Sequence, residues 1–132
     1  AVRFVGQRER LSSTLQDAMR EVEEKNSPDP AFVLWICISY GSKAEIVQAA
    51  EAAAKDGVIT EDSLSRHLWT SGMPDPDLII RTSGEQRISN FLLWQGAYSE
   101  LFFLKTYWPA FTKEDLRAVL DEYAARERRM GR

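Results

Sequence analysis

Residues 77–103 read DLIIRTSGEQRISNFLLWQGAYSELFF, and this stretch decides how the chain is expected to fold. Its first part, "DLIIRT" (77–82), is an apolar run that ends in a polar loop, and it predicts a strand. Its last part, "ELFFL" (100–104), predicts the final strand of the chain. Between the two we expect a helix that begins near Ser89. The apolar residues of this helix would be Phe91, Leu92, Leu93 and Trp94.

The rest of the chain alternates in the same way. "AFVLWICISY" (31–40) is a continuous apolar run and predicts a strand that is buried on both faces. Ser42, with Glu45 three residues later, predicts a capping box at the start of the next helix. The other expected elements are a strand at 2–5, a helix from about residue 10 to near Lys25, a short helix after Thr60, and a last helix capped by Thr112 and Asp115, with Leu116, Val119, Leu120 and Tyr123 on its inner face.

Strands that alternate with helices predict an α/β fold, in which a parallel sheet carries helices on both faces. Four strands are few for such a sheet, and no element precedes the strand at 2–5. We therefore expect the chain to start in the middle of a fold. The pattern leaves open whether the chain is a fragment, a proteolysed product or a subunit of a split protein.

The composition is that of one ordinary domain. The chain has 132 residues, of which 44% are hydrophobic and 28% charged. A net charge of −3 and a pI near 5.2 exclude nucleic-acid binding driven by overall charge. The single cysteine, Cys37, lies in an apolar run and predicts a small buried side chain; without an internal disulfide, a reducing cytoplasmic setting is favoured. No apolar stretch approaches 18 residues, so we expect no membrane span.

The polar loop after "LII" is the strongest candidate for a binding site. Ligands of open parallel sheets bind beyond the carboxyl ends of the strands, and the loop from Arg81 to Arg87 occupies that position. Two guanidinium groups suit a diphosphate, because each can donate a bidentate pair of hydrogen bonds. Gly84 would let the backbone come close to a ligand, and a helix that begins at Ser89 would add N–H donors. The loop therefore predicts a phosphate or diphosphate site.

A simpler interpretation stays open beside it. Glu85 could pair with one of the arginines in a solvated loop, while Ser89 caps the helix. The spacing alone does not decide between the two.

Other candidates are weaker. Asp75 and Asp77 flank a proline before their strand and are more typical of a turn than of a metal pair. A dyad of Cys37 with the only histidine, His67, has no supporting spacing. "SYGSK" (39–43) follows a strand and opens a helix, which repeats the anion-site pattern less strongly.

The stretch 77–103 also closely resembles the signature of the cis-prenyltransferases, the undecaprenyl diphosphate synthase family. "VRFVG" at the start, "SYGSKAEI" after the second strand, and "WPAFTKEDL" and "RERRMG" near the end extend the resemblance along the whole chain. It covers the C-terminal half of the family's catalytic domain. The resemblance implies that residues 1–132 are the C-terminal portion of a single domain of that family.

The resemblance also implies an activity. Members condense isopentenyl diphosphate with an allylic diphosphate in cis geometry, use Mg2+, and usually work as homodimers. Such a protein would be cytoplasmic, would bind no nucleic acid, and would contact a membrane peripherally through its product. The implied substrate-binding residues are Arg81, Arg87, Ile88, Ser89 and Arg129, the last in an Arg-x-Gly ending that reaches the partner's diphosphate in some members.

Glu100 matches the family's metal-binding glutamate, although the strand-end rule alone would put it at the far edge of the sheet. Gln86 stands where many members have a histidine that binds the metal. An amide oxygen is a poorer ligand than imidazole for a transition metal but is acceptable to Mg2+. Gln86 is thus a weaker candidate ligand than Glu100.

No segment resembles the family's Asp-Gly-Asn-Gly-Arg motif, which supplies the catalytic aspartate. We therefore expect no catalytic residue in this chain and no activity from the isolated 132 residues. Two other functions stay open: a non-catalytic partner subunit of a heteromeric cis-prenyltransferase, and a phosphate-binding α/β module without turnover. The joint presence of Arg81, Arg87, Ser89 and Glu100 argues against the first of these.

Overall fold

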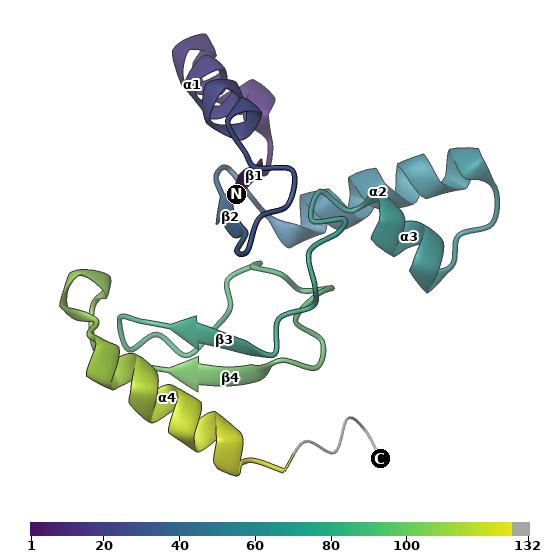
Figure 1. The fold of residues 1–132 in the computed structure, drawn as a ribbon. Coiled ribbons are helices and arrows are strands. Elements are labelled where there is room, and N and C mark those ends of the chain that lie inside the picture. The colour runs from purple at the N-terminus through teal and green to yellow at the C-terminus, as the bar shows by residue number, and fades with distance from the viewer. Residues whose placement is uncertain (128–132) are drawn as a thin grey trace. The chain divides into compact units, whose positions relative to one another are not determined.

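The computed structural model describes residues 1–127 and divides the chain into two compact units, 1–73 and 74–132. Strands and helices alternate as expected, and all strand pairs are parallel, which confirms the α/β class (Figure 1). The strands form two separate two-stranded sheets, not the single sheet that we expected. No helix within residues 1–127 is long and apolar enough to cross a membrane.

The first unit begins with the parallel pair β1 (Val2–Val5) and β2 (Leu34–Cys37). Between them run a short 3-10 helix, η1 (Arg8–Arg10), and helix α1 (Ser13–Glu24), which begins where the Ser12 side chain accepts from the Leu15 N–H. The expectation that β2 is buried on both faces is wrong. Leu34 is 45% exposed, the other three residues of β2 are half-buried, and β2 pairs only with β1 among the described strands.

Side chains from η1, from α1 and from the turn after α1 cover the edge of β1 that faces away from β2. Asn26 binds both backbone groups of Val2, accepting from its N–H and donating to its carbonyl at 2.7 Å each. Glu23 accepts from the Phe4 N–H at 2.9 Å, and Arg8 donates to the Phe4 carbonyl at 2.5 Å. Arg8 and Glu23 also form an ion pair of 2.6 Å. The backbone groups at this edge are thus paired without a further strand.

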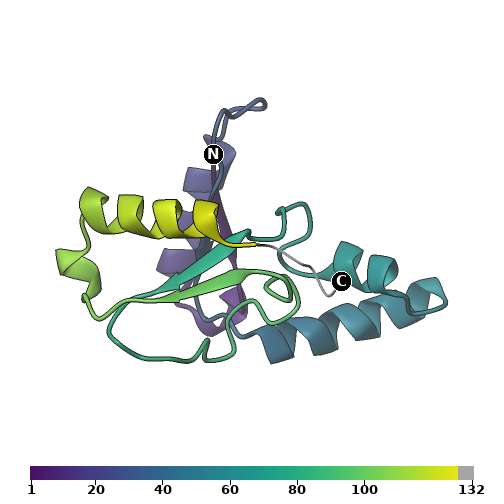
Figure 2. The ribbon, with the colours of Figure 1, turned by 90° about the horizontal axis from the view of Figure 1, so that it is seen from below.

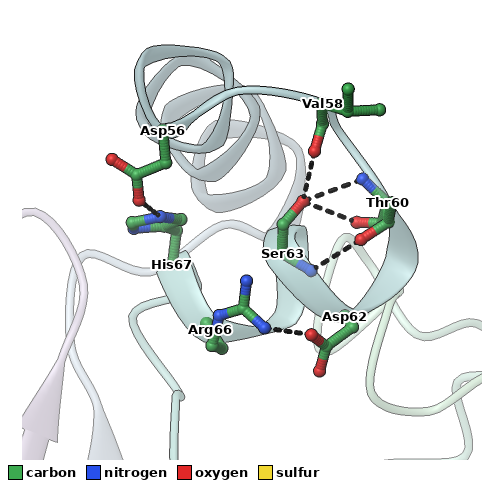
Figure 3. Close-up of polar contacts among 7 residues, drawn as sticks. All are labelled: Asp56, Val58, Thr60, Asp62, Ser63, Arg66 and His67. Atoms are coloured by element: carbon green, nitrogen blue, oxygen red, sulfur yellow. Dashed lines mark hydrogen bonds and ion pairs between the residues drawn. The ribbon is translucent and has the colours of Figure 1, made fainter.

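Helices α2 (Ser42–Asp56) and α3 (Glu61–His67) lie side by side in Figures 1 and 2. Ala49 and Ala53 are fully buried, and such small side chains allow helices to approach closely. The start of α3 after Thr60 is confirmed: Thr60 and Ser63 bond to each other's N–H groups in a capping box (Figure 3).

The predicted capping box of α2 is wrong. Gly41 is the N-cap residue, and no side chain caps the helix. Glu45 is instead fully buried, where it accepts from the N–H and hydroxyl of Thr70 at 3.1 and 3.0 Å and from the Tyr40 hydroxyl at 2.5 Å. Its carboxylate therefore ties α2 to the segment after α3.

The second unit contains the parallel pair β3 (Leu78–Arg81) and β4 (Glu100–Phe103), the 3-10 helix η2 (Trp108–Ala110) and helix α4 (Lys113–Ala125). Figures 1 and 2 both show α4 alongside the two strands. The predicted Thr112–Asp115 capping box is confirmed. Of its expected inner face, Val119 is buried, whereas Leu116 and Leu120 are 39% and 45% exposed.

The helix expected near Ser89 does not form. The backbone enters the left-handed region at Ser89 (φ 48°), Asn90 (φ 65°) and Leu92 (φ 47°), which a right-handed helix cannot accommodate. These turns bury Leu92 and bring Gly96 against β3, where an added Cβ would lie 2.9 Å from Ile79 Cδ1 and 2.8 Å from the Leu92 carbonyl oxygen. Packing against β3 outweighs the local helical pattern.

Candidate functional site

Arg81 is the last residue of β3, so its side chain starts at the carboxyl end of a parallel strand, as expected. One guanidinium nitrogen, Nη1, donates to the Arg87 carbonyl at 2.5 Å and to the Ser89 hydroxyl at 2.8 Å. Arg81 therefore holds residues 87–89 next to the end of the strand. These residues were predicted to share one site, and the structure brings them together.

The start of the loop is fixed by backbone hydrogen bonds to the segment after β4. The Ser83 N–H donates to Thr106 O at 2.8 Å, and the Gly84 N–H donates to Leu104 O at 2.7 Å. Ser83 and Gly84 both have positive φ angles, 81° and 76°. A non-glycine residue such as Ser83 rarely adopts a positive φ, and it keeps this angle only where the surrounding structure holds it. The loop thus has a defined shape at its base.

Arg87 lies on the outer part of the loop. Its guanidinium forms an ion pair with Glu85, and the two side chains are 60% and 45% exposed. This is the contact that the simpler interpretation foresaw. An ion pair this exposed stabilises a protein by only about 0–1 kcal/mol, so a multiply charged anion can replace Glu85 as the partner of Arg87.

The other predicted residues of the loop are accessible or half-buried. Gln86 and Ser89 are exposed, and Ile88 is half-buried. The Ile88 carbonyl accepts from the Phe91 N–H at 3.0 Å, which begins the turn that replaces the expected helix. Because that helix is absent, the loop lacks the helix dipole, and its positive charge comes from the two arginines.

Glu100 lies at the opposite end of the strand pair from Arg81. In the register of β3 and β4, Glu100 is opposite Leu78, whereas Arg81 is opposite Phe103. Three residues of strand separate the two positions, or roughly 10 Å at about 3.3 Å per residue. Within one chain, the structure does not bring Glu100 to the arginine loop.

The carboxylate of Glu100 is bound by Arg126, at the end of α4. The distance from Arg126 Nη1 to Glu100 Oε2 is 2.7 Å. Hydrogen bonds to Glu100 and then to Glu122 raise the pKa of Arg126. This contact was not predicted from the sequence, where "RERRMG" served only to extend the family resemblance. The spacing of Glu122 and Arg126, four residues apart, is the one local signal that points to it.

These residues fit a metal site in part. Hard Mg2+ takes oxygen ligands, and Glu100 Oε1 accepts no hydrogen bond within residues 1–127. Among those residues, however, no group of three or more His, Cys, Asp or Glu side chains could hold a metal ion. Glu100 can therefore serve as one ligand, and the described part of the chain does not complete the site.

The remaining candidates have structural partners or lie outside the description. Asp77 accepts from the Tyr123 hydroxyl at 3.1 Å, which suits a packed turn. His67 pairs with Asp56 at 2.7 Å, not with Cys37 (Figure 3). Burial raises the pKa of the Cys37 thiol to about 11, so it is neutral at ordinary pH and a poor nucleophile. Arg129 lies outside the described residues.

Comparison with known proteins identifies close relatives along the whole chain. The family described as "Putative undecaprenyl diphosphate synthase" matches residues 1–131. The chain is 44% identical to the isoprenyl transferase of Agrobacterium fabrum and 46% identical to that of Thermotoga maritima. In each case the match covers 98% of this chain, and 56% and 58% of the respective relative. The chain thus spans a little over half the length of the curated relatives that it matches.

Two solved structures share the fold. A "probable undecaprenyl diphosphate synthase" from Campylobacter jejuni superimposes with a TM-score of 0.89 at 33% identity, over 99% of this chain and 62% of that one. The lavandulyl diphosphate synthase of Lavandula x intermedia, solved in complex with dimethylallyl diphosphate, gives a TM-score of 0.91 at 34% identity, over 99% and 60%.

Proposed function

The chain belongs to the undecaprenyl diphosphate synthase family, and from this we propose that it is the isopentenyl diphosphate-binding half of a cis-prenyltransferase. The observation that carries the proposal is the contact of Arg81 with Arg87 O and Ser89 Oγ at the end of β3. This contact gives the loop a defined conformation, and the loop is positively charged and exposed to solvent at Arg87 and Ser89. The whole protein would join isopentenyl diphosphate to an allylic diphosphate.

The loop suits a diphosphate for electrostatic reasons. Arg87 faces solvent and is held only by an exposed pair with Glu85. A diphosphate carries more charge than a carboxylate and accepts bidentate hydrogen bonds from guanidinium, so it would compete well for this side chain. Ser89 and the neighbouring Ile88 would complete the contact, while Arg81 keeps them in place.

In the proposed reaction, this chain positions the isopentenyl substrate. Arg81 and Arg87 would fix its diphosphate and so orient its double bond toward the allylic carbon. The allylic carbon–oxygen bond breaks and releases diphosphate, the electron pair of the isopentenyl double bond forms the new carbon–carbon bond, and the condensed product loses a proton to form its new double bond. Bound Mg2+ would supply neutralisation of the diphosphate charge, with Glu100 as one ligand and Gln86 as a weaker candidate. The catalytic aspartate is expected outside these 132 residues.

We propose a homodimer for the active protein. Glu100 and the arginine loop lie at opposite ends of one strand pair, so a site that uses both is most simply built from two protomers. Arg129 would likewise reach across the dimer and bind the diphosphate in the site of the partner. We also propose a cytoplasmic protein that touches a membrane only peripherally, through its polyprenyl product.

The test is prenyl transfer by the full-length protein that contains this chain. Radiolabelled isopentenyl diphosphate, an allylic diphosphate such as dimethylallyl diphosphate, and Mg2+ should give labelled polyprenyl product. The isolated 132 residues should give none until the upstream half is supplied, fused or as a separate chain. A full-length protein that binds isopentenyl diphosphate without turnover would instead indicate a phosphate-binding module, and activity that appears only with a second, different subunit would indicate a partner subunit.

A further inference from the structure

Arg126 is held on three sides. Its Nη1 contacts Glu100 Oε2 at 2.7 Å, and its Nη2 contacts Glu122 Oε1 at 2.5 Å. The guanidinium carbon also lies 4.1 Å from the centroid of the Phe102 ring, which is buried in β4. A cation over an aromatic face is attracted to it, and the flat guanidinium suits such stacking. The arginine is thus fixed by the start of β4 and by its own helix.

The fixed arginine restricts the carboxylate in turn. The side chain of Glu100 is 25% exposed, and among residues 1–127 Arg126 contacts its oxygen Oε2. The second oxygen, Oε1, accepts no hydrogen bond within the described residues 1–127. A glutamate alone at the start of a strand would sample many rotamers, and ordering it costs entropy. With Arg126 in place, much of that ordering exists before a ligand arrives.

We propose that Arg126 is a positioning residue, which fixes the carboxylate of Glu100 through Oε2 so that Oε1 binds the divalent cation that accompanies the diphosphate. The inference rests on the proposed function, because it takes Glu100 as a ligand. Residues that orient a metal ligand through its other polar atom commonly change metal affinity when they are replaced.

Arg126 also carries a positive charge close to the cation, and this repulsion acts in the opposite direction. If repulsion dominates, removal of the arginine strengthens cation binding; if positioning dominates, removal weakens it. The two effects therefore predict opposite signs, and one binding measurement separates them. Because Arg126 contacts Glu100, Glu122 and Phe102, we expect its positioning of the Glu100 carboxylate to outweigh the repulsion.

The experiment measures Mn2+ binding by electron paramagnetic resonance in the full-length protein, without substrate. Arg126→Met should weaken Mn2+ binding by about tenfold or more, and Arg126→Lys, which keeps the charge and one donor, by less. Arg117→Met removes an exposed arginine from the same helix and should bind Mn2+ like the wild type. Unchanged or tighter Mn2+ binding by Arg126→Met would overturn the proposal.

Kinetics give a second readout. Arg126→Met should raise the Mg2+ concentration for half-maximal rate, while KM for isopentenyl diphosphate at saturating Mg2+ stays within about twofold. If Arg126→Met does not fold, as judged by its thermal midpoint, Arg126→Lys decides alone, and wild-type Mn2+ affinity in that variant would overturn the proposal. A wild-type protein that makes no product, while Mn2+ binding still falls in the variants, would contradict the proposed function and not the role of Arg126.

Discussion

Arg81 and Glu100 lie at opposite ends of the same pair of parallel strands, one at the carboxyl end of β3 and the other at the amino end of β4. The two residues proposed to serve one reaction therefore cannot meet within a single chain without rearrangement of the strands. This separation gives a direct test of the proposed dimer.

Two impaired variants of the full-length protein should complement each other. In a mixed dimer of Arg87→Ala and Glu100→Gln, one of the two sites receives an intact Arg87 from one protomer and an intact Glu100 from the other. Random mixing of two defective chains should then restore about a quarter of wild-type activity. Prenyl transfer after co-expression and co-purification checks this. If the mixture is no more active than the average of the two variants alone, both groups act within one chain.

Arg87→Ala should weaken substrate binding without loss of fold. One charge-assisted hydrogen-bond anchor is worth about 1.5–3 kcal/mol, which corresponds to roughly a tenfold to hundredfold loss in kcat/KM for isopentenyl diphosphate. The thermal midpoint should hardly move, because the pair with Glu85 is exposed. Glu85→Gln is the matched control, since it removes the same ion pair and leaves the arginine. An unchanged kcat/KM in Arg87→Ala would contradict the assignment.

Gly96→Ala should destabilise the second unit. The added Cβ would lie 2.8 Å from the Leu92 carbonyl oxygen and 2.9 Å from Ile79 Cδ1, and both distances are shorter than ordinary non-bonded contacts of a Cβ atom. Overpacking of this kind costs about 1–3 kcal/mol. Urea unfolding of the full-length protein measures the loss, and Ala97→Ser at the exposed neighbouring position should be nearly neutral. Equal midpoints for the two variants would mean that the turn adjusts freely.

Glu23 should make stability depend on pH. Its hydrogen bond from Arg8 holds the pKa of Glu23 below the ordinary value, against a smaller opposing effect of burial. The stabilisation is therefore present above the unfolded-state pKa of about 4.3 and is lost as pH falls through the lower folded-state value. Glu23→Gln should cost about 1–2 kcal/mol at pH 7, since its partner is partly exposed, and much less near pH 3. Thermal midpoints at both values check this, with Glu24→Gln as an exposed control; a pH-independent difference would mean that the charge of Glu23 is unimportant.

Local patterns predicted what local contacts determine. The start of α3 and the Thr112–Asp115 capping box follow from residues three apart, and both are present. The same pattern at Ser42 failed, because Glu45 has a stronger set of partners in Thr70, 25 residues away, and in Tyr40. A capping pattern states what a side chain can do, and burial determines what it does.

In the candidate site, too, the sequence predicted the local features and not those that depend on tertiary packing. The strand that ends at Arg81 and the polar loop after it are visible in the sequence, and so is their family. The turns at Ser89 and Leu92 are not, since they depend on the packing of Gly96 against Ile79. The pairing of Glu100 with Arg126 joins residues 26 apart and depends on α4 lying alongside β4. Sequence could not show a contact that only the docking of a helix creates.

The hydrogen bonds at the outer edge of β1 determine which edge of the first sheet can accept another strand. Asn26, Glu23 and Arg8 already use the N–H and carbonyl groups of Val2 and Phe4 on that side. An incoming strand would have to displace an ion pair and four hydrogen bonds there, whereas the far side of β2 presents no such barrier within the described residues. A further strand, whether from the same polypeptide or from a neighbour, should therefore pair with β2. Edge-to-edge pairing of another sheet with β1 is disfavoured.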